Sequence, residues 1–246
     1  MLQNKIALVT GGSRGIGAEI VKQFAKERAT IVFTYSNSKD RANELINSLS
    51  GINKNITAVQ ADANFPETMK SLVDEVVGKY GRIDILVNNA GIVSTGIIGE
   101  IEIKDYEAIM NVNVHSVFTL TNAAVKHIPE GGRIINISSI LGIRAIKQGS
   151  SIYNASKFAI QGFSRSWARD LASKGILVNT ISPGSVNTEM NPDSPENPRA
   201  ETIKSNNPLG RFIRANEVAS ATTFLASSSA SGITGTDITV DGGFNA

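Results

Sequence analysis

A tyrosine and a lysine four residues apart, Tyr153 and Lys157, open a segment with a helical pattern. Residues at this spacing share one face of a helix, so the phenol and the ammonium group lie one turn apart. A tyrosine that acts as an acid or base near neutral pH must exchange its proton well below its ordinary pKa of about 10. A neighbouring lysine cation favours the phenolate. The pair therefore indicates proton transfer to or from a substrate oxygen.

The same spacing occurs a second time, in Tyr35 and Lys39, so the position in the chain must separate the two pairs. Tyr35 ends the second predicted strand, whereas Tyr153 follows the fifth, which ends in Ser138 and Ser139. Ligands of an open α/β sheet bind outside the carboxyl ends of the strands, so a serine hydroxyl and Tyr153 can converge there. Neighbouring residues of a strand point to opposite sides, so only one of Ser138 and Ser139 can face Tyr153.

Short apolar runs alternate with amphipathic helical stretches along the whole chain. The predicted strands are Ile6–Thr10, Thr30–Tyr35, Ile56–Asp62, Ile83–Asn88, Arg133–Ser138, Leu177–Ser182 and Asp237–Val240. Strands that are apolar nearly throughout are typical of a parallel sheet with both faces covered. The sequence therefore predicts one α/β domain over residues 1–246: a Rossmann fold, with a doubly wound, seven-stranded parallel sheet and helices on both faces.

The first predicted strand runs into a glycine-rich turn and then at once into a helix. Glycines let the backbone approach a pyrophosphate closely, and the helix N-terminus offers free N–H donors. The spacing is G-x-x-x-G-x-G rather than G-x-G-x-x-G, so the inference depends on the position between strand and helix. We assign dinucleotide binding here to Gly11, Ser13, Arg14, Gly15, Ile16 and Gly17.

The end of the second predicted strand bears on which dinucleotide binds. NAD sites usually place an acidic residue there to bind the ribose 2′-hydroxyl. This strand ends in Tyr35-Ser36-Asn37, and no acid occurs before Asp40. A 2′-phosphate can be accepted instead, with Arg14 as its cation and Ser36 and Asn37 as hydrogen-bond donors. The sequence therefore favours NADP(H) over NAD(H).

Composition excludes several other classes of protein. The 246 residues are 41% hydrophobic and 19% charged, which suits one large core. With no cysteine and only two histidines, we predict neither disulfides nor a metal site. The net charge of +2, without a Lys/Arg cluster, predicts no nucleic-acid partner. We see neither a secretory signal nor a membrane span, and we expect a cytoplasmic protein without a membrane partner.

Residues 187–208 contain four of the prolines, at positions 192, 195, 198 and 208. This pattern predicts a long loop with one short helix near Arg199–Lys204. Long loops in compact domains are usually lids or binding segments, so we call residues 187–208 the substrate loop. A plain surface insertion is the alternative.

Further motifs follow the other predicted strands. They are Asn88-Asn89-Ala90-Gly91, Asn113 within Asn111–His115, Pro183-Gly184-x-Val186-x-Thr188, and the terminal Asp241-Gly242-Gly243. Together with the glycine turn and the Tyr153–Lys157 pair, they make the chain resemble the short-chain dehydrogenase/reductase family over essentially its whole length. Residues 207–211 and 233–243 are similar to those of 3-oxoacyl-acyl-carrier-protein reductases.

The resemblance implies an NADPH-dependent oxidoreductase that reduces a ketone or a 3-oxoacyl carbonyl to a secondary alcohol. Tyr153 would donate a proton to the carbonyl oxygen, and Ser139 would hydrogen-bond that oxygen. Lys157 would lower the pKa of Tyr153 and bind the nicotinamide ribose. Asn113 would hold a water that links Lys157 to solvent, with Asn111 as a rival for this role.

The resemblance also implies further cofactor contacts. Asp62 and Ala63 would contact the adenine, and Asn89 and Gly91 the adenosine side. The residues that follow the sixth strand and reach the nicotinamide end would be Pro183, Gly184, Val186 and Thr188. Each has a purely structural alternative: Asp62 could cap a turn, Asn89 could satisfy buried backbone, and Thr188 could simply begin the loop.

The implied partners are a small carbonyl or alcohol substrate, with an acyl thioester as an option, and identical subunits. The family resemblance predicts a homotetramer packed through the long helices beside the catalytic segment and through the C-terminal strand region. Lys174 matches one basic position of the carrier-protein reductases, but residues 125–133 lack their basic run, which favours free ketones. Arg144 and Lys147 could meet an anionic substrate, although we favour solvated charges.

A nucleotide-binding sensor on the same fold is the alternative from a different class, because a fold does not fix a function. Phe33-Thr34-Tyr35 and Asn191-Pro192 are similar to segments of a bacterial cyclic-di-GMP-binding member of the family. The complete set of asparagine, serine, tyrosine and lysine argues against a pure sensor, which needs no activated phenol.

Overall fold

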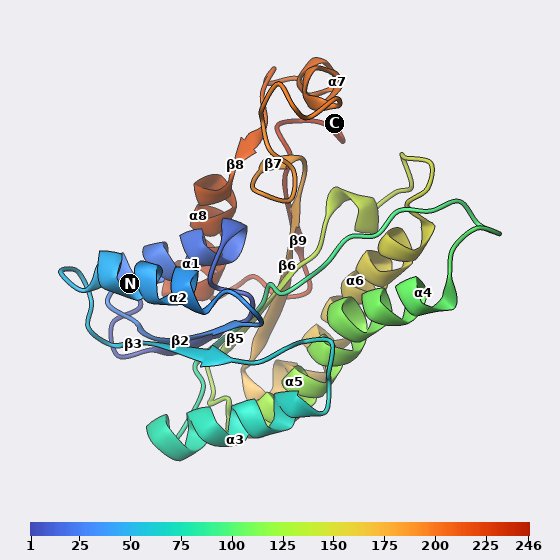
Figure 1. The fold of residues 1–246 in the computed structure, drawn as a ribbon. Helices are drawn as coiled ribbons and strands as arrows, with labels where there is room; N and C mark the ends of the chain where they lie inside the picture. The colour runs from blue at the N-terminus through green and yellow to red at the C-terminus, as the bar shows by residue number, and fades with distance from the viewer.

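Seven strands form one parallel sheet in the order β3-β2-β1-β4-β5-β6-β9 (Figure 1). The computed structural model describes residues 1–246. The strand order reverses between β1 and β4, which is where a doubly wound sheet opens a crevice for ligands. The predicted fold class, a seven-stranded Rossmann fold, is thereby confirmed.

The predicted strands are all present, with bounds that differ from the expected ones by no more than two residues. They are β1 (Ile6–Val9), β2 (Thr30–Tyr35), β3 (Ile56–Gln60), β4 (Ile85–Asn88), β5 (Arg133–Ile137), β6 (Leu177–Pro183) and β9 (Asp237–Val240). A second, small sheet pairs β7 (Val186–Asn187) with β8 (Ile213–Arg214) in parallel. Strands of two residues leave no periodic pattern, so the sequence did not predict this sheet.

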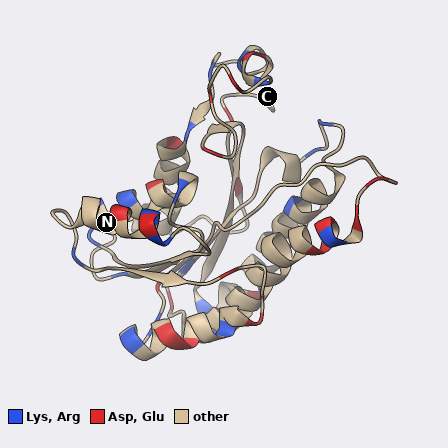
Figure 2. Cartoon of the chain, viewed as in Figure 1, with Lys and Arg blue, Asp and Glu red and all other residues tan.

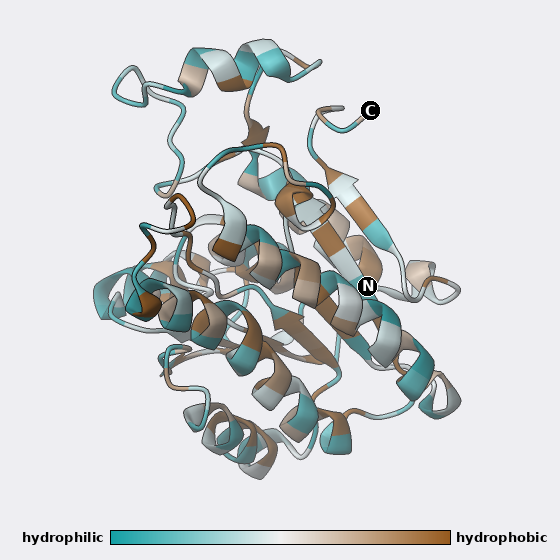
Figure 3. Ribbon diagram, turned by 90° about the vertical axis from the view of Figure 1, so that its right-hand side faces the viewer, coloured by the Kyte–Doolittle hydropathy of each residue, from teal (hydrophilic) through white to brown (hydrophobic).

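The helices cover both faces of the sheet (Figure 1). One core contains residues of α1 (Gly15–Lys26), α2 (Lys39–Leu49) and α8 (Ala215–Ala226). The other contains residues of α3 (Thr68–Tyr80), α5 (Ser116–Ala124) and α6 (Ser151–Leu171). Strand alternation divides β1 between them, since Ala7 and Val9 join the first core and Ile6 and Leu8 the second. Figure 3 shows apolar strands with hydrophilic residues on the outer faces of the helices.

One long helical run changes its geometry in the middle. α4 (Ile103–Met110) leads into α5 through a π-helical turn at Asn111–His115, where the N–H of Ser116 donates to the carbonyl of Asn111. Such turns widen a helix and occur frequently at functional sites. Single 3₁₀ turns occur at Val125–His127, Ile140–Gly142, Ala172–Lys174 and Ser228–Ala230.

The substrate loop contains the short helix α7 (Ala200–Asn206), close to the predicted position, and stands beyond the carboxyl ends of the strands (Figure 1). Both ends of the loop are fixed. Asn187 pairs with Arg214 in the small sheet, and the Asn207 amide donates to the carbonyl of Asp241 at 3.2 Å. Gly242 has a φ of 70°, and an added Cβ there would lie 2.3 Å from the Asn207 Oδ1, so this contact requires glycine.

Lys and Arg are mixed with Asp and Glu over the helices and loops (Figure 2). None of the helices combines the length and the apolar character that crossing a membrane would require.

Candidate active site

The glycine turn between β1 and α1 is built by close backbone packing. The N–H of Gly11 donates to the Thr34 hydroxyl at 3.0 Å, which ties the turn to β2. A Cβ added to Gly17 would lie 2.2 Å from the carbonyl oxygen of Gly11, so only glycine fits there. The Asn89 amide donates to the carbonyls of Thr10 at 2.9 Å and Gly11 at 3.1 Å and holds the turn from the other side.

The first turn of α1 can accept an anion. Its N-cap residue, Arg14, makes no side-chain cap, and the first turn contains no acidic residue. The free N–H groups of a helix start carry partial positive charge and suit a phosphate. The residues present therefore fit the diphosphate of a dinucleotide.

A cleft of about 700 Å³, lined by 41 residues, lies next to the glycine turn between β1 and α1. The volume falls within the roughly 300–1,000 Å³ typical of ligand and cofactor sites. It brings together nearly all the predicted site residues, namely Gly11, Ser13, Arg14, Gly15, Ile16, Gly17, Tyr35, Ser36, Asp62, Ala63, Asn89, Gly91, Ser139, Tyr153, Lys157, Pro183, Gly184, Val186 and Thr188. Asn37 does not line the cleft, and Ser38 does. Asn113 lies behind the lining.

Lys157 is buried beneath Tyr153. Its side chain is 5% exposed, and its Nζ donates to the carbonyl of Ile137 at 3.0 Å and lies 5.7 Å from the centre of the Tyr153 ring. Burial lowers the pKa of Lys157 to about 8. Burial also raises the pKa of Tyr153, and the Ser139 hydroxyl opposes that rise. We had expected Lys157 to lower the Tyr153 pKa; among the protein groups alone, desolvation of the phenolate dominates.

The two serines after β5 have different tasks. The Ser138 hydroxyl is buried and donates to the carbonyl of Lys157 at 3.1 Å, so it fastens α6 to the sheet. The Ser139 hydroxyl accepts from the N–H of Leu141 at 3.1 Å and interacts with Tyr153. Ser139 is therefore the serine whose hydroxyl is available to a ligand.

The π-helical turn gives Asn111 and Asn113 different surroundings, as the segment after β5 does for Ser138 and Ser139. The Asn113 Oδ1 accepts from the N–H of Ile92 at 2.9 Å, while its amide donates to the Ile92 carbonyl at 3.0 Å and to the Ser156 hydroxyl at 3.1 Å. Asn113 thus holds the wall of the cleft next to Gly91. The Asn111 Oδ1 lies 3.2 Å from the Nδ1 of His115, on the outer side of the helix.

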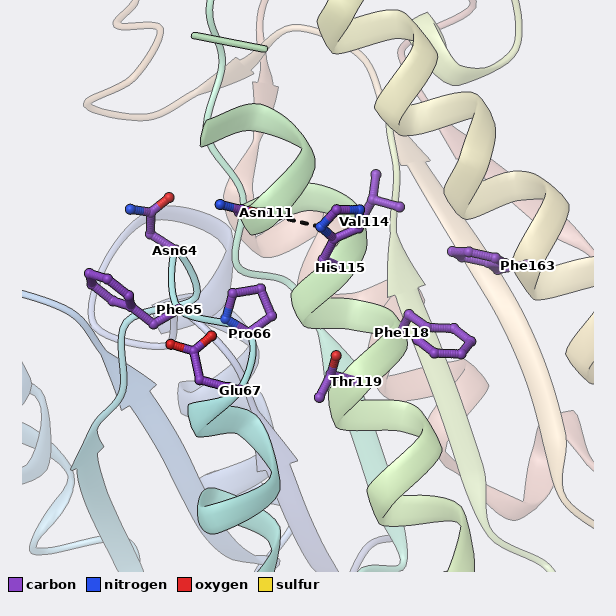
Figure 4. Close-up of a pocket in the computed structure, with 10 residues that line it drawn as sticks. All are labelled: Asn64, Phe65, Pro66, Glu67, Asn111, Val114, His115, Phe118, Thr119 and Phe163. Atoms are coloured by element: carbon purple, nitrogen blue, oxygen red, sulfur yellow. Dashed lines mark hydrogen bonds between the residues drawn. The ribbon is translucent and has the colours of Figure 1, made fainter. Parts of the chain in front are cut away.

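Asn111 and His115 line a second hollow of about 630 Å³, between the start of α3 and α5 (Figure 4). Its remaining lining consists of Asn64, Phe65, Pro66, Glu67, Val114, Phe118, Thr119 and Phe163. It shares no lining residue with the large cleft. Asn111 consequently lies away from Tyr153.

A chain of buried amides and hydroxyls sets the position of α6. The Asn88 amide donates to the Asn136 Oδ1 at 2.7 Å, and the Asn136 amide donates to the Ser164 hydroxyl at 2.8 Å. Buried polar groups that satisfy one another fix a single packing arrangement. This chain and the contacts of Lys157 hold the helix that carries Tyr153 against β4 and β5.

The three structural alternatives also apply, and that for Asn89 is its bonds to the backbone carbonyls of Thr10 and Gly11. The Asp62 Oδ1 accepts from the N–H of Asn64 at 2.9 Å and so caps a turn. Thr188 forms a short antiparallel bridge with Asn191. All three residues still line the cleft, so a structural task and a ligand contact can coexist.

Sequence reasoning identified Arg14 and Lys147 but missed the charged residues Arg41, Glu189 and Arg199. Glu189 forms ion pairs with Arg14, at 3.8 Å, and with Arg41 in the first turn of α2. At the other end, Lys147 and Arg199 both line the cleft. No local pattern marks Arg41, because its partner lies 148 residues away in the sequence.

Comparison with known proteins gives consistent results. A family model described as enoyl-(acyl carrier protein) reductase matches residues 11–245. The chain is 38% identical to the 3-oxoacyl-[acyl-carrier-protein] reductase FabG of Thermotoga maritima over 244 residues, 98% of each chain. It is also 38% identical, over 242 residues and 98% of each chain, to the cyclic-di-GMP-binding biofilm dispersal mediator protein of Escherichia coli.

Among solved structures, a short chain dehydrogenase from Burkholderia cenocepacia in complex with NADP has a TM-score of 0.96 and 40% identity. The match covers 100% of this chain and 99% of the other. The glycine turn, the Ser139–Tyr153–Lys157 cluster and these full-length similarities show that the chain belongs to the short-chain dehydrogenase/reductase family of oxidoreductases.

Proposed function

We propose that this protein is an NADPH-dependent reductase that converts a ketone or 3-oxoacyl carbonyl into a secondary alcohol. The observation that carries the proposal is the meeting of Ser139, Tyr153 and Lys157 in the same cleft as the glycine turn. The phenol of Tyr153 is protonated near neutral pH, which is the form that a proton donor to a carbonyl needs, and the Ser139 hydroxyl opposes the rise in its pKa that burial causes.

NADP(H) is the proposed cofactor. The first turn of α1 would hold the diphosphate, and Arg14 and Ser36 would meet the 2′-phosphate. Lys157 would hold the nicotinamide ribose. When bound, the reduced nicotinamide supplies the hydride. The Burkholderia relative, solved with NADP, supports this choice.

The side chains would divide the remaining work. Ser139 would hydrogen-bond the carbonyl oxygen and stabilise the charge that develops on it. Tyr153 would give its proton to that oxygen. Lys157, cationic below its pKa of about 8, would stabilise the phenolate that remains. Both N–H groups of the Asn113 amide are engaged within the protein, so a water that resupplies the proton would donate to an oxygen of Asn113.

A finer choice of substrate rests on the relatives. The Thermotoga relative is a reductase of 3-oxoacyl groups on acyl carrier protein, which supports that class, whereas residues 125–133 lack the basic run that we expect for carrier recognition. The Escherichia relative binds cyclic-di-GMP, which keeps a nucleotide sensor as the second candidate function.

We also propose a homotetramer. The outer faces of α5 and α6 expose Phe118 at 47% and Phe158 at 44%, beside the stacked rings of Phe163 and Trp167. Apolar surface of this kind is typical of a subunit interface. A monomeric mass in light scattering would contradict the proposal. The cytoplasmic location stays a prediction.

The test is turnover by Tyr153→Phe. Consumption of NADPH is followed by absorbance with acetoacetyl-CoA and a panel of free ketones, and NADPH binding is measured separately. We expect activity to fall roughly 10²–10⁴-fold, the usual contribution of a general acid, with cofactor binding retained. Tyr106→Phe, at an exposed position of α4 outside the cleft, is the matched control. A wild-type protein that binds NADPH and reduces nothing in the panel would favour the sensor.

A further inference from the structure

The end of the cleft that faces the substrate loop carries two cations without partners. Lys147, in the connection before α6, and Arg199, the residue before α7, line the same cleft as Tyr153. Neither forms a salt bridge within the chain. Two unpaired cations on different segments, facing one cavity, form a site for an anion.

Of the other charged residues of the substrate loop, Glu196 is hydrogen-bonded to Ser194 and does not line the cleft, and the rest are already paired. Lys204 binds Asp193 at 2.8 Å and Glu201 at 3.2 Å, so the cation of α7 is neutralised. Glu189, the only acidic residue of the loop that lines the cleft, is held by Arg41 at the opposite end. No acidic residue of the loop is therefore left inside the cleft to neutralise the two cations.

The two cations, Lys147 and Arg199, also repel each other. Burial and the charge of Arg199 lower the pKa of Lys147. Both cations are largely open to solvent, and the apolar side chains of Ile146, Ile203 and Phe244 line the same cleft. An anion bound between the cations would remove their repulsion.

We propose that the substrate carries an anionic group, a carboxylate or a phosphate, which Lys147 and Arg199 bind while the carbonyl faces Tyr153. This inference rests on the proposed reductase function and adds its substrate class. Lys147 precedes the helix of Tyr153 by only a few residues, whereas Arg199 belongs to the substrate loop. The anion therefore joins the loop to the catalytic wall and orients the carbonyl between them.

The carboxylate of a free oxo acid and the phosphates of an acyl thioester carrier offer the same chemistry. Two matched pairs of substrates distinguish them. Acetoacetate is compared with its neutral methyl ester, and acetoacetyl-CoA with the neutral N-acetylcysteamine thioester of acetoacetate. kcat and KM are measured at low and high salt for the wild type, Lys147→Gln, Arg199→Gln and a control, Lys70→Gln, on the exposed side of α3.

We expect Lys147→Gln and Arg199→Gln each to lower kcat/KM for the anionic member of one pair by roughly 3- to 10-fold, mainly through KM, as partly screened ion pairs do. The neutral member and the Lys70 control should not change. Arg199→Lys should recover part of the loss because it restores the charge. The pair that responds identifies the source of the anion.

Equal losses for charged and neutral substrates, or no effect of either variant, would overturn the inference while leaving the reductase function intact. If no substrate is turned over, binding of acetoacetate and of CoA to the NADPH-loaded protein is measured by quenching of cofactor fluorescence. Binding that weakens in both variants would support the anion site and refute the reductase function. The absence of such binding would overturn the anion site.

Discussion

Replacing Lys157 by methionine should make the protein more stable. The side chain is 5% exposed, and its pKa falls from the ordinary 10.5 to about 8 because burial disfavours the charged form. That difference corresponds to about 3 kcal/mol of free energy that opposes folding at neutral pH. Methionine has a similar length and no charge, but it cannot donate to the Ile137 carbonyl, which costs about 1–2 kcal/mol. The expected net gain is about 1–2 kcal/mol.

The sign of this effect depends on pH. Below pH 8, Lys157 is charged in both the folded and the unfolded state, and the full penalty applies. Between its folded pKa of about 8 and its unfolded pKa of 10.5, only the unfolded state keeps the proton, so the wild type gains stability as pH rises. The advantage of Lys157→Met should therefore be largest near pH 7 and should shrink at about pH 9.5.

Urea unfolding followed by circular dichroism, at one fixed protein concentration, measures this difference at both pH values. Lys70→Met, an exposed substitution on α3, is the control and should change stability by less than about 0.5 kcal/mol. A Lys157→Met protein that is less stable than the wild type at pH 7 would refute the reasoning, and so would an advantage that stays constant with pH. In the proposed mechanism this more stable variant is also inactive.

Three further predictions concern other parts of the cleft. Arg41→Gln should weaken NADPH binding roughly 3- to 10-fold and leave NADH binding unchanged. Glu189→Gln should tighten NADPH binding, because it frees Arg41 from its ion pair. Titration of cofactor fluorescence measures both effects, and equal shifts for NADPH and NADH would contradict the prediction. Ser138→Ala should lower the melting temperature, because it removes the hydrogen bond to α6, and should largely keep kcat. Ser139→Ala should instead lower kcat roughly 10²-fold and leave the melting temperature unchanged. Gly17→Ala should lower the melting temperature by roughly 6–12 °C and abolish NADPH binding, as calorimetry and titration would show, because the new methyl group meets the Gly11 carbonyl.

The sequence is sufficient to predict the order of the strands in the chain and most of the residues that line the cleft. Apolar runs such as Ile85–Asn88 bury both faces, so their order along the chain predicts a parallel sheet, and its carboxyl edge collects the motifs that follow each strand. Strand alternation leaves one of Ser138 and Ser139 facing Tyr153, and the family resemblance, in which the second serine of the pair is used, selects Ser139. These inferences depend on local periodicity, which one chain displays directly.

Features that depend on three-dimensional distance or burial were not predictable. The contact between Arg41 and Glu189 spans 148 residues. The rise of the Tyr153 pKa reflects desolvation, which the Ser139 hydroxyl only partly opposes and which has no signature in the sequence. Lys147 is exposed, in agreement with the solvated charge that we favoured, but its place in the lining of the cleft depends on how the connection before α6 folds back.

The way in which the substrate loop is fastened has a consequence for how such a protein can change. Its two ends are held by the pairing of Asn187 with Arg214 and by the hydrogen bond from Asn207 to Asp241. The contacts that hold the ends in place therefore do not depend on the residues between them. Doubling the length of a loop between fixed ends costs only about 0.6 kcal/mol of closure entropy. Insertions and exchanges within residues 188–206 should therefore alter substrate choice at little cost in folding, which makes this loop the natural place to graft or evolve a new specificity.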